Sequence, residues 1–228
     1  MFACKHYRSD CIEIQNVVKT EFRILNSLDH GSIIKARELI FNKTKGSLYL
    51  ILEYCNFPTL RSIVQNNDVS ELDSLSILKK ILEAVLYLHE TGICHRDLKP
   101  SNVLVSENYH QIKIIDFNVA KNMKKSSGKF SIMSSMMLES ISPNEFEIQS
   151  MLTPTGKPFY RAPEISKGLF TEKVDIWSSG LIFLELITKK KCKQIKNDDI
   201  ARREIRELLS GFLEEDSTKR FSAFDALQ

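Results

Sequence analysis

The sequence lacks the features of several broad classes of protein. It has no apolar run long enough to cross a membrane, no secretory signal at its start and no internal repeat. Its five cysteines are scattered, and no two have the Cys-x-x-Cys spacing of a metal or redox site. We therefore expect reduced thiols and a protein of the cytoplasm or the nucleus.

A strong excess of one charge is also missing. The 228 residues include 32 lysines and arginines against 29 aspartates and glutamates, a formal net charge of +3. So small an excess does not indicate a dedicated nucleic-acid-binding protein. Hydrophobic residues make up 43% of the chain, which is enough for a sizeable core in one large domain or two small lobes.

What the chain does have is a polar run, His95 to Asn102, which reads His-Arg-Asp-Leu-Lys-Pro-Ser-Asn. Asp116 follows it as the first residue of an Asp-Phe-Asn tripeptide. Phosphoryl transfer requires positioning and charge compensation from the protein, and these residue types can supply both. Carboxylate and amide oxygens are also the ligands that Mg²⁺ prefers. The residue types are compatible with a phosphoryl-transfer site, and the plainer alternative is a polar loop after an amphipathic helix.

These motifs resemble the catalytic core of eukaryotic protein kinases of the Ser/Thr type. The resemblance implies that Asp97 accepts or orients the proton of the attacking hydroxyl and that Lys99 faces the γ-phosphate of ATP. It implies that Asn102 and Asp116 hold Mg²⁺. The tripeptide Ala162-Pro-Glu164 matches the end of the family's activation segment.

The implied fold is of the α+β class, with two kinase-like lobes. Residues 1–54 would form a small β lobe and residues 55–228 a mainly helical large lobe, with an activation segment at 116–164. In the family, a glycine-rich loop and two strands precede the lysine strand. Only four residues precede Lys5, so we expect a truncated small lobe without that loop.

The stretch Phe2-Ala-Cys-Lys5 resembles the family's lysine strand. By resemblance, Lys5 holds the α- and β-phosphates and pairs with Glu21, and Ala3 and Leu104 sandwich the adenine ring. An apolar face at helical spacing predicts a helix around Glu21; its members are Val18, Phe22, Leu25 and Leu28.

Strands are predicted at 33–41 and 48–54, separated by a polar turn. The second strand resembles the one that leads into the kinase hinge. Leu52 then takes the gatekeeper position, and the backbone carbonyl of Glu53 and the backbone amide of Cys55 would pair with adenine.

Helices are predicted at 72–91, from 173 to about 188, and at 200–213. The first has a broad apolar stripe and ends at Gly92, which can adopt the left-handed conformation.

Two long-range contacts follow from motifs in these elements. Asp175, in an Asp-x-Trp-Ser motif, would anchor the backbone of the catalytic loop. Arg220, in an Asp-x-x-x-Arg turn, should pair with Glu164.

Two residues depart from the family's pattern. Asn118 stands where the family has glycine, and asparagine is the residue next most tolerant of the left-handed backbone. Lys157 stands where Ser/Thr kinases usually have threonine. The stretch 121–150 reads as a long insertion, and Thr153, with Thr155 as second choice, is a candidate phosphorylation site that would pair with Arg96.

Two functions stay open. The first is an ATP-dependent serine/threonine protein kinase that uses Mg-ATP and a protein substrate, with no nucleic-acid or membrane partner. The alternative is a pseudokinase, a binding or scaffold module, which the missing glycine-rich loop, Asn118 and Lys157 favour. A small-molecule phosphotransferase is disfavoured by the Ala-Pro-Glu and Asp-x-Trp-Ser motifs, and a thermal-shift titration with Mg-ATP separates the first two.

Overall fold

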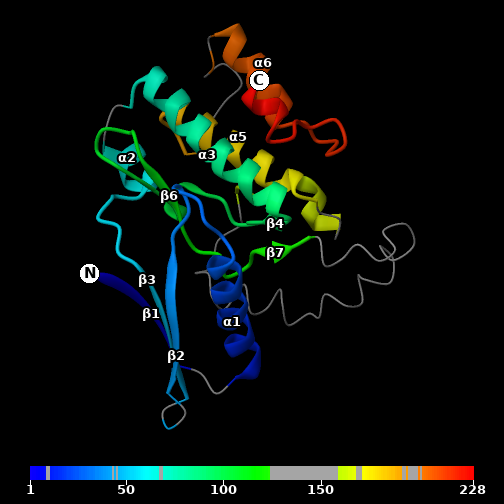
Figure 1. Cartoon of the computed structure of the whole chain (residues 1–228). Helices are drawn as coiled ribbons and strands as arrows, with labels where there is room; N and C mark the ends of the chain where they lie inside the picture. The colour runs from blue at the N-terminus through cyan, green and yellow to red at the C-terminus, as the bar shows by residue number, and fades with distance from the viewer. Residues whose placement is uncertain are drawn as a thin grey trace.

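The computed structural model describes residues 1–8, 11–42, 44, 46–66, 69–123, 159–167, 171–191, 194, 200 and 202–228. They form a small lobe, built from a sheet and one helix, and a larger, mainly helical lobe (Figure 1). This arrangement confirms the expected α+β, two-lobed fold. Among the described helices, none is both long and apolar enough to span a membrane.

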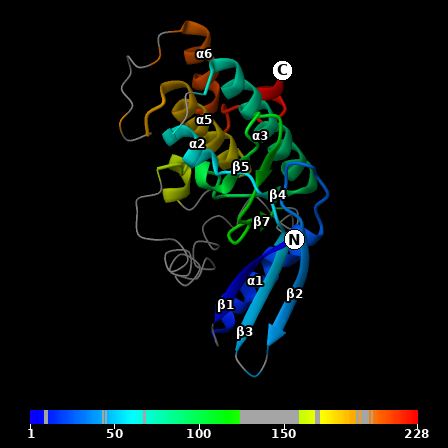
Figure 2. The same ribbon diagram turned by 90° about the vertical axis from the view of Figure 1, so that its left-hand side faces the viewer.

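The small lobe is an antiparallel sheet with the strand order β1-β3-β2, where β1 is Phe2–Arg8, β2 is Ala36–Asn42 and β3 is Ser47–Glu53. Helix α1 (Ile12–Asn26) lies beside this sheet (Figure 2). Half-buried and exposed residues alternate along β1. A strand with one covered face shows this period of two, because successive side chains point to opposite faces.

The predicted strand 33–41 begins too early. The ladder of β2 starts at Ala36, and Ile33 instead makes an isolated parallel bridge with Ile114 of the large lobe. The backbone amide of Ile34 also donates to the carbonyl of Ile114, at 3.0 Å. Ile33 and Ile34 are both buried, so this stretch joins the two lobes rather than extending the sheet.

The large lobe begins with α2 (Leu60–Asn66), which the sequence did not predict, and α3 (Glu71–Thr91). The side chain of Ser70 caps α3 by accepting from the amide of Asp73 at 3.1 Å, and Gly92 ends the helix at a φ of 81°. The expected termination at Gly92 is therefore confirmed. The remaining elements are β4 (Ile93–Cys94), η1 (Pro100–Asn102), β5 (Val103–Val105), β6 (Ile112–Ile114), β7 (Lys121–Asn122), η3 (Pro163–Lys167), α5 (Lys173–Thr188), α6 (Arg203–Phe212) and η6 (Asp225–Leu227).

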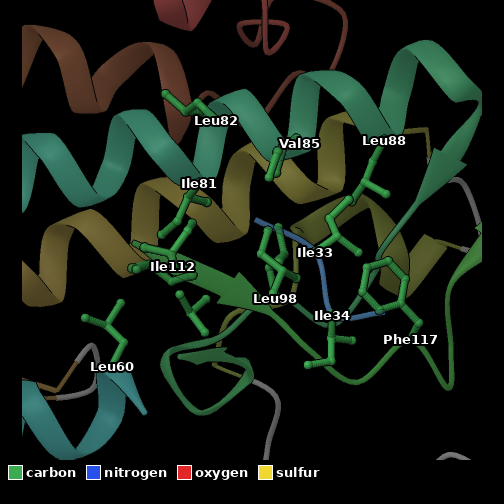
Figure 3. Close-up of a cluster of buried hydrophobic side chains, with 14 of the residues drawn as sticks. Ile33, Ile34, Leu60, Ile81, Leu82, Val85, Leu88, Leu98, Ile112 and Phe117 are labelled. Atoms are coloured by element: carbon green, nitrogen blue, oxygen red, sulfur yellow. The ribbon is translucent and has the colours of Figure 1, made fainter. Parts of the chain in front are cut away.

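The core runs through both lobes. Figure 3 shows Ile81, Val85 and Leu88 on the side of α3 that faces Leu98 and Ile33. Most residues of α5 are buried, which explains why its sequence is apolar nearly all round. The segment that follows α3 is thus packed into the core between α3, α5 and the small lobe.

Helix α6 is shorter at both ends than the predicted 200–213 and packs closely against its neighbours. A Cβ added at Gly180 of α5 would lie 2.5 Å from Cβ of Phe212. One added at Gly211 would lie 2.0 Å from the ring of Phe221. Both glycines allow an approach that any larger residue would block.

Candidate active site

A buried carboxylate anchors the segment that follows α3. Asp175 of α5 accepts from the amide of His95 at 2.9 Å and from the amide of Arg96 at 2.8 Å, and Nε2 of His89 lies 3.1 Å from it. These contacts confirm the predicted anchoring of the catalytic loop. Burial alone would raise the pKa of Asp175, but its hydrogen bonds and the nearby histidines lower that pKa.

Arg96 itself adopts a φ of 70°, in the left-handed region. A residue with a side chain reaches this region only where the surrounding contacts compensate for the strain. The two hydrogen bonds from adjacent backbone amides to Asp175 supply that compensation. The turn directs Asp97, the next residue, away from the buried face, and its side chain is 20% exposed.

Asp97 is at the centre of a small polar group. Nζ of Lys99 lies 2.7 Å from its Oδ2, and Nδ2 of Asn102 donates to the same oxygen at 3.0 Å and to the backbone carbonyl of Asp97 at 2.8 Å. The structure therefore brings together the three residues that the sequence predicted as catalytic. Because the amide nitrogen of Asn102 is used toward Asp97, its amide oxygen is the atom left for a cation.

Lys5 of β1 connects the two lobes. Its Nζ lies 2.7 Å from Oε1 of Glu21 on α1 and 2.8 Å from Oδ1 of Asp116. The predicted pair of Lys5 and Glu21 is therefore confirmed. Burial alone would lower the pKa of Lys5, but the charges of Glu21 and Asp116 outweigh it and raise that pKa, so the ammonium stays charged.

Glu21 has two further contacts. The backbone amide of Phe117 donates to its Oε1 at 3.2 Å, and the hydroxyl of Tyr7 donates to its Oε2 at 3.4 Å. Phe117 is fully buried and its ring meets the imidazole of His95 edge to face, with centroids 4.6 Å apart. Phe117 therefore packs in the core, and the hydrogen bond from its amide to Glu21 ties the Asp-Phe-Asn motif to α1.

The left-handed residue of the Asp-Phe-Asn motif is Asp116, with a φ of 68°. Asn118 is absent from the residues at positive φ, so the idea that it replaces glycine by its tolerance of that conformation is wrong. Its Oδ1 is buried and has no hydrogen-bond partner in the described part of the chain. Aspartate tolerates the left-handed region better than most residues, which explains why the strain falls there.

The residues expected around adenine come from both lobes. Ala3 of β1 pairs with Leu52 of β3, which is buried, whereas Leu104 of β5 is half-buried and bridges to Thr59 after the hinge. Their predicted roles as adenine contacts and gatekeeper stay predictions.

The hinge residue Glu53 is tied to both lobes through its side chain. Its Oε1 lies 2.6 Å from Nζ of Lys113 on β6 and accepts from the amide of Lys35 at 3.0 Å. Cys55 is half-buried, and burial raises the pKa of its thiol. The proposed pairing of the Glu53 and Cys55 backbones with adenine stays a prediction.

A second long-range pair closes the activation segment. Nη1 and Nη2 of Arg220 bond the two carboxylate oxygens of Glu164 at 2.6 Å and 3.0 Å, which confirms the predicted pair. The guanidinium also lies over the ring of Trp177, 5.0 Å from its centroid. The predictions that concern Lys157, Thr153 and Thr155 lie outside the described residues.

A model of the protein kinase domain matches residues 1–228, the full chain. The chain belongs to the protein kinase family. Among curated relatives, this kinase chain is 35% identical over 185 residues to calcium-dependent protein kinase 5 of Plasmodium berghei (strain Anka), covering 80% of the chain and 29% of the relative. It is 37% identical over 171 residues to human calcium/calmodulin-dependent protein kinase type IV, covering 74% of the chain and 31% of that protein.

A third relative carries the substrate type in its name. Serine/threonine-protein kinase cds1 of Schizosaccharomyces pombe (strain 972 / ATCC 24843) is 29% identical over 235 residues, covering 91% of this chain and 46% of cds1. The chain spans less than half the length of each of the three relatives.

A solved structure supports the fold. The yeast RNA Pol II CTD kinase CTDK-1 complex contains a chain that superposes with a TM-score of 0.74 at 22% identity. The superposition covers 100% of this chain and 84% of that one. At this identity the likeness establishes the kinase fold and nothing further.

The residues of the kinase fit Mg²⁺ bound together with a nucleotide better than Mg²⁺ bound alone. Asp116 and Asn102 offer a carboxylate and an amide oxygen, and no group of three or more histidine, cysteine or acidic side chains that could hold a metal occurs among the described residues. Mg²⁺ usually takes one or two protein carboxylates and completes its shell with water and substrate phosphates. The donor set therefore suits a metal that arrives with ATP.

Two sets of side-chain contacts were not predicted from the sequence, those of Tyr7 and those of Arg61. The resemblance to the lysine strand covers residues 2–5 and does not include Tyr7, although the alternation of β1 places Tyr7 on the side of Lys5. Arg61 of α2 lies 3.1 Å from Oε2 of Glu185 and also contacts the hydroxyl of Tyr160. No local signal could have found the second set, because α2 itself was not predicted.

Proposed function

We propose that this protein is an ATP-dependent serine/threonine protein kinase, which transfers the γ-phosphate of Mg-ATP to hydroxyl groups of protein substrates. The observation that carries the proposal is the joint arrangement of Lys5, Glu21 and Asp116 across the two lobes, with both distances under 3 Å. Residues this far apart in the sequence meet only when the small lobe, α1 and the Asp-Phe-Asn motif are all correctly placed. The family membership supports the same activity.

In this proposal, Asp97 orients the acceptor hydroxyl and takes its proton as the new bond from that oxygen to the γ-phosphorus forms and the bond from the γ-phosphorus to the leaving ADP breaks. The neighbouring ammonium of Lys99, 2.7 Å from Asp97, would compensate negative charge on the transferring group. Asn102 fixes the position of Asp97 through two hydrogen bonds. The protein thus supplies orientation and charge, which phosphoryl transfer mainly requires.

On the nucleotide side, Lys5 would bind the α- and β-phosphates, while Asp116 and Asn102 would hold Mg²⁺. Bound Mg²⁺ neutralises part of the negative charge of the phosphates. Ala3 and Leu104 would contact the two faces of adenine, with Leu52, Glu53 and Cys55 along its edge. A cytoplasmic or nuclear location and a protein substrate belong to the same proposal.

A pseudokinase is the second candidate. The observation that favours it is the buried Oδ1 of Asn118, which has no partner in the described part of the chain and lies two residues from Asp116. An unsatisfied buried amide costs free energy and biases the motif toward other conformations. In that case the protein would keep the fold and bind partners without turnover.

The test is phosphate transfer from γ-labelled Mg-ATP to a degenerate peptide library that contains serine, threonine and tyrosine acceptors. We expect label on serine and threonine with the wild type and none with Asp97→Asn, because Asp97 acts on the acceptor. Nucleotide binding, followed by calorimetry, should be nearly the same in both proteins. Asp29→Asn, which removes a mostly exposed carboxylate paired with Lys35, is the matched control and should keep full activity.

Label transfer that survives in Asp97→Asn would show that this residue is not the base. A wild type that binds Mg-ATP and transfers no label would favour the pseudokinase.

A further inference from the structure

Tyr7 lies on the same face of β1 as Lys5. Side chains two positions apart on a strand point to the same face, and both Lys5 and Tyr7 reach Glu21 of α1. Lys5 approaches Oε1 at 2.7 Å, and the hydroxyl of Tyr7 donates to Oε2 at 3.4 Å. Two residues on the same face of one strand therefore hold the two oxygens of a single carboxylate.

Glu21 needs both of these partners. Its side chain is 0% exposed, and a buried ionised carboxylate is tolerated only when its oxygens are hydrogen-bonded. Oε1 has two donors, Lys5 and the backbone amide of Phe117. The donor found for Oε2 in the described part of the chain is Tyr7.

Tyr7 also differs from Lys5 in the other partners that compete with Glu21 for it. The ammonium of Lys5 is shared with Asp116, and the phosphates of a nucleotide would attract the same charge. The hydroxyl of Tyr7 is neutral, and burial and the charge of Glu21 raise the pKa of Tyr7, so it stays a donor. It can hold Glu21 whichever partner Lys5 has.

We propose that Tyr7 is a positioning residue for phosphoryl transfer. Its hydroxyl fixes the Glu21 carboxylate in the orientation that reaches Lys5, and so keeps α1 in the assembled position before a nucleotide binds. The consequence for turnover rests on the proposed kinase function, whereas the consequence for α1 does not.

The kinetic test is Tyr7→Phe, which removes the hydroxyl and keeps the ring. If fewer molecules are in the assembled state, apparent ATP affinity falls by the same factor, so we expect KM for ATP to rise roughly three- to ten-fold. We expect kcat at saturating ATP to stay close to the wild type, because bound ATP selects the assembled state. A purely structural role would lower the folded fraction, and hence kcat, at unchanged KM.

The matched control is Tyr49→Phe. Tyr49 lies on the adjacent strand β3, where its ring stacks on His6 at 4.6 Å, and no hydrogen bond to Glu21 is found for it. This variant should have the KM and kcat of the wild type.

The second measurement does not require activity. Hydrogen exchange followed by mass spectrometry should show faster exchange in α1 and at the amide of Phe117 in Tyr7→Phe. In a Glu21→Met background, which has no carboxylate to hold, adding Tyr7→Phe should cause no further change.

The outcomes separate the two proposals. An unchanged KM together with unchanged exchange in Tyr7→Phe overturns the role of Tyr7 and leaves the kinase function standing. A wild type without phosphate transfer removes the kinase function, and the exchange of α1 then decides the role of Tyr7 alone.

Discussion

The pair Arg220–Glu164 and the pair Lys5–Glu21 both join distant parts of the sequence, but their surroundings differ. The side chain of Arg220 is 0% exposed, and besides both oxygens of Glu164 its guanidinium donates to the carbonyls of Glu214 and Lys173. The side chain of Lys5 is 30% exposed, and its ammonium is divided between Glu21 and Asp116.

This difference indicates what each pair can do. A buried guanidinium with a fixed geometry and several partners cannot exchange one of them without leaving a buried group unpaired. An ammonium on a flexible stem, partly in water, can move between two carboxylates and a phosphate at little cost. We infer that Arg220 holds the end of the activation segment and that Lys5 changes partner when a nucleotide binds.

The largest expected effect is that of Arg220→Ala. The variant leaves Glu164 without its guanidinium, and breaking a buried pair from one side typically costs about 3–5 kcal/mol of unfolding free energy. Arg220→Lys should lie between this variant and the wild type, because a lysine cannot bond both carboxylate oxygens in the same way. Urea denaturation measures the unfolding free energies of both variants. A loss below about 1 kcal/mol for Arg220→Ala would mean that this pair stabilises the protein no more than an exposed ion pair does.

The next effect concerns Asp175, a buried carboxylate, and the dependence of the unfolding free energy on pH. Its folded-state pKa lies below the ordinary value of 3.8, so its stabilising contribution is present above that value and is lost as the pH falls through the folded-state pKa. We expect unfolding free energy to fall from about pH 5 to about pH 3. His89→Phe removes one hydrogen-bond donor and should reduce this slope; an identical slope would assign the pH dependence to other groups.

Asp116→Asn tests the contact between Lys5 and Asp116, which we expect to exchange when a nucleotide binds. Asp116 is 28% exposed and Lys5 keeps Glu21, so the unfolding free energy should change by less than about 1 kcal/mol. Mg-dependent ATP binding should weaken by at least about ten-fold, or roughly 1.4 kcal/mol, because the carboxylate ligand is lost. Calorimetric titration with and without Mg²⁺ measures this, and equal affinities for the two proteins would exclude Asp116 as a metal ligand.

The smallest effect is expected at an exposed pair. Arg203 and Glu207 lie one helical turn apart on α6 with a separation of 2.6 Å, and both side chains are mostly exposed. Such pairs contribute little because water and salt screen them. Arg203→Ala should therefore unfold at the same urea concentration as the wild type, and a clear shift would mean that distance alone, without burial, makes a pair stabilising.

The sequence predicted the parts of the fold that have strong local signals. The helix around Leu78 and Leu82 has a long apolar stripe and a glycine at its end, and the structure places it at Glu71–Thr91. The pair of Arg220 and Glu164 followed from motifs whose spacing the family fixes. The helix follows from the periodicity of the residues themselves, whereas the pair was implied by the resemblance to the kinase family.

The features that sequence reasoning missed depend on tertiary contacts. Helix α2 has only seven residues, too few for a periodic pattern to stand out. Ile33 has a strand-like sequence but bridges to Ile114, which local periodicity cannot reveal. Tyr7 reaches Glu21 only through the placement of β1 against α1, and the left-handed φ of Asp116 is set by the contacts of the Asp-Phe-Asn motif.

The most direct test of the account is a crystal structure of the protein with Mg²⁺ and a non-hydrolysable ATP analogue. We expect Nζ of Lys5 to leave Asp116 for the phosphate oxygens while it keeps Glu21. We expect Asp116 and Asn102 to contact the metal and the bonds between Arg220 and Glu164 to be unchanged. A nucleotide bound elsewhere, with Lys5 still on Asp116, would contradict this expectation.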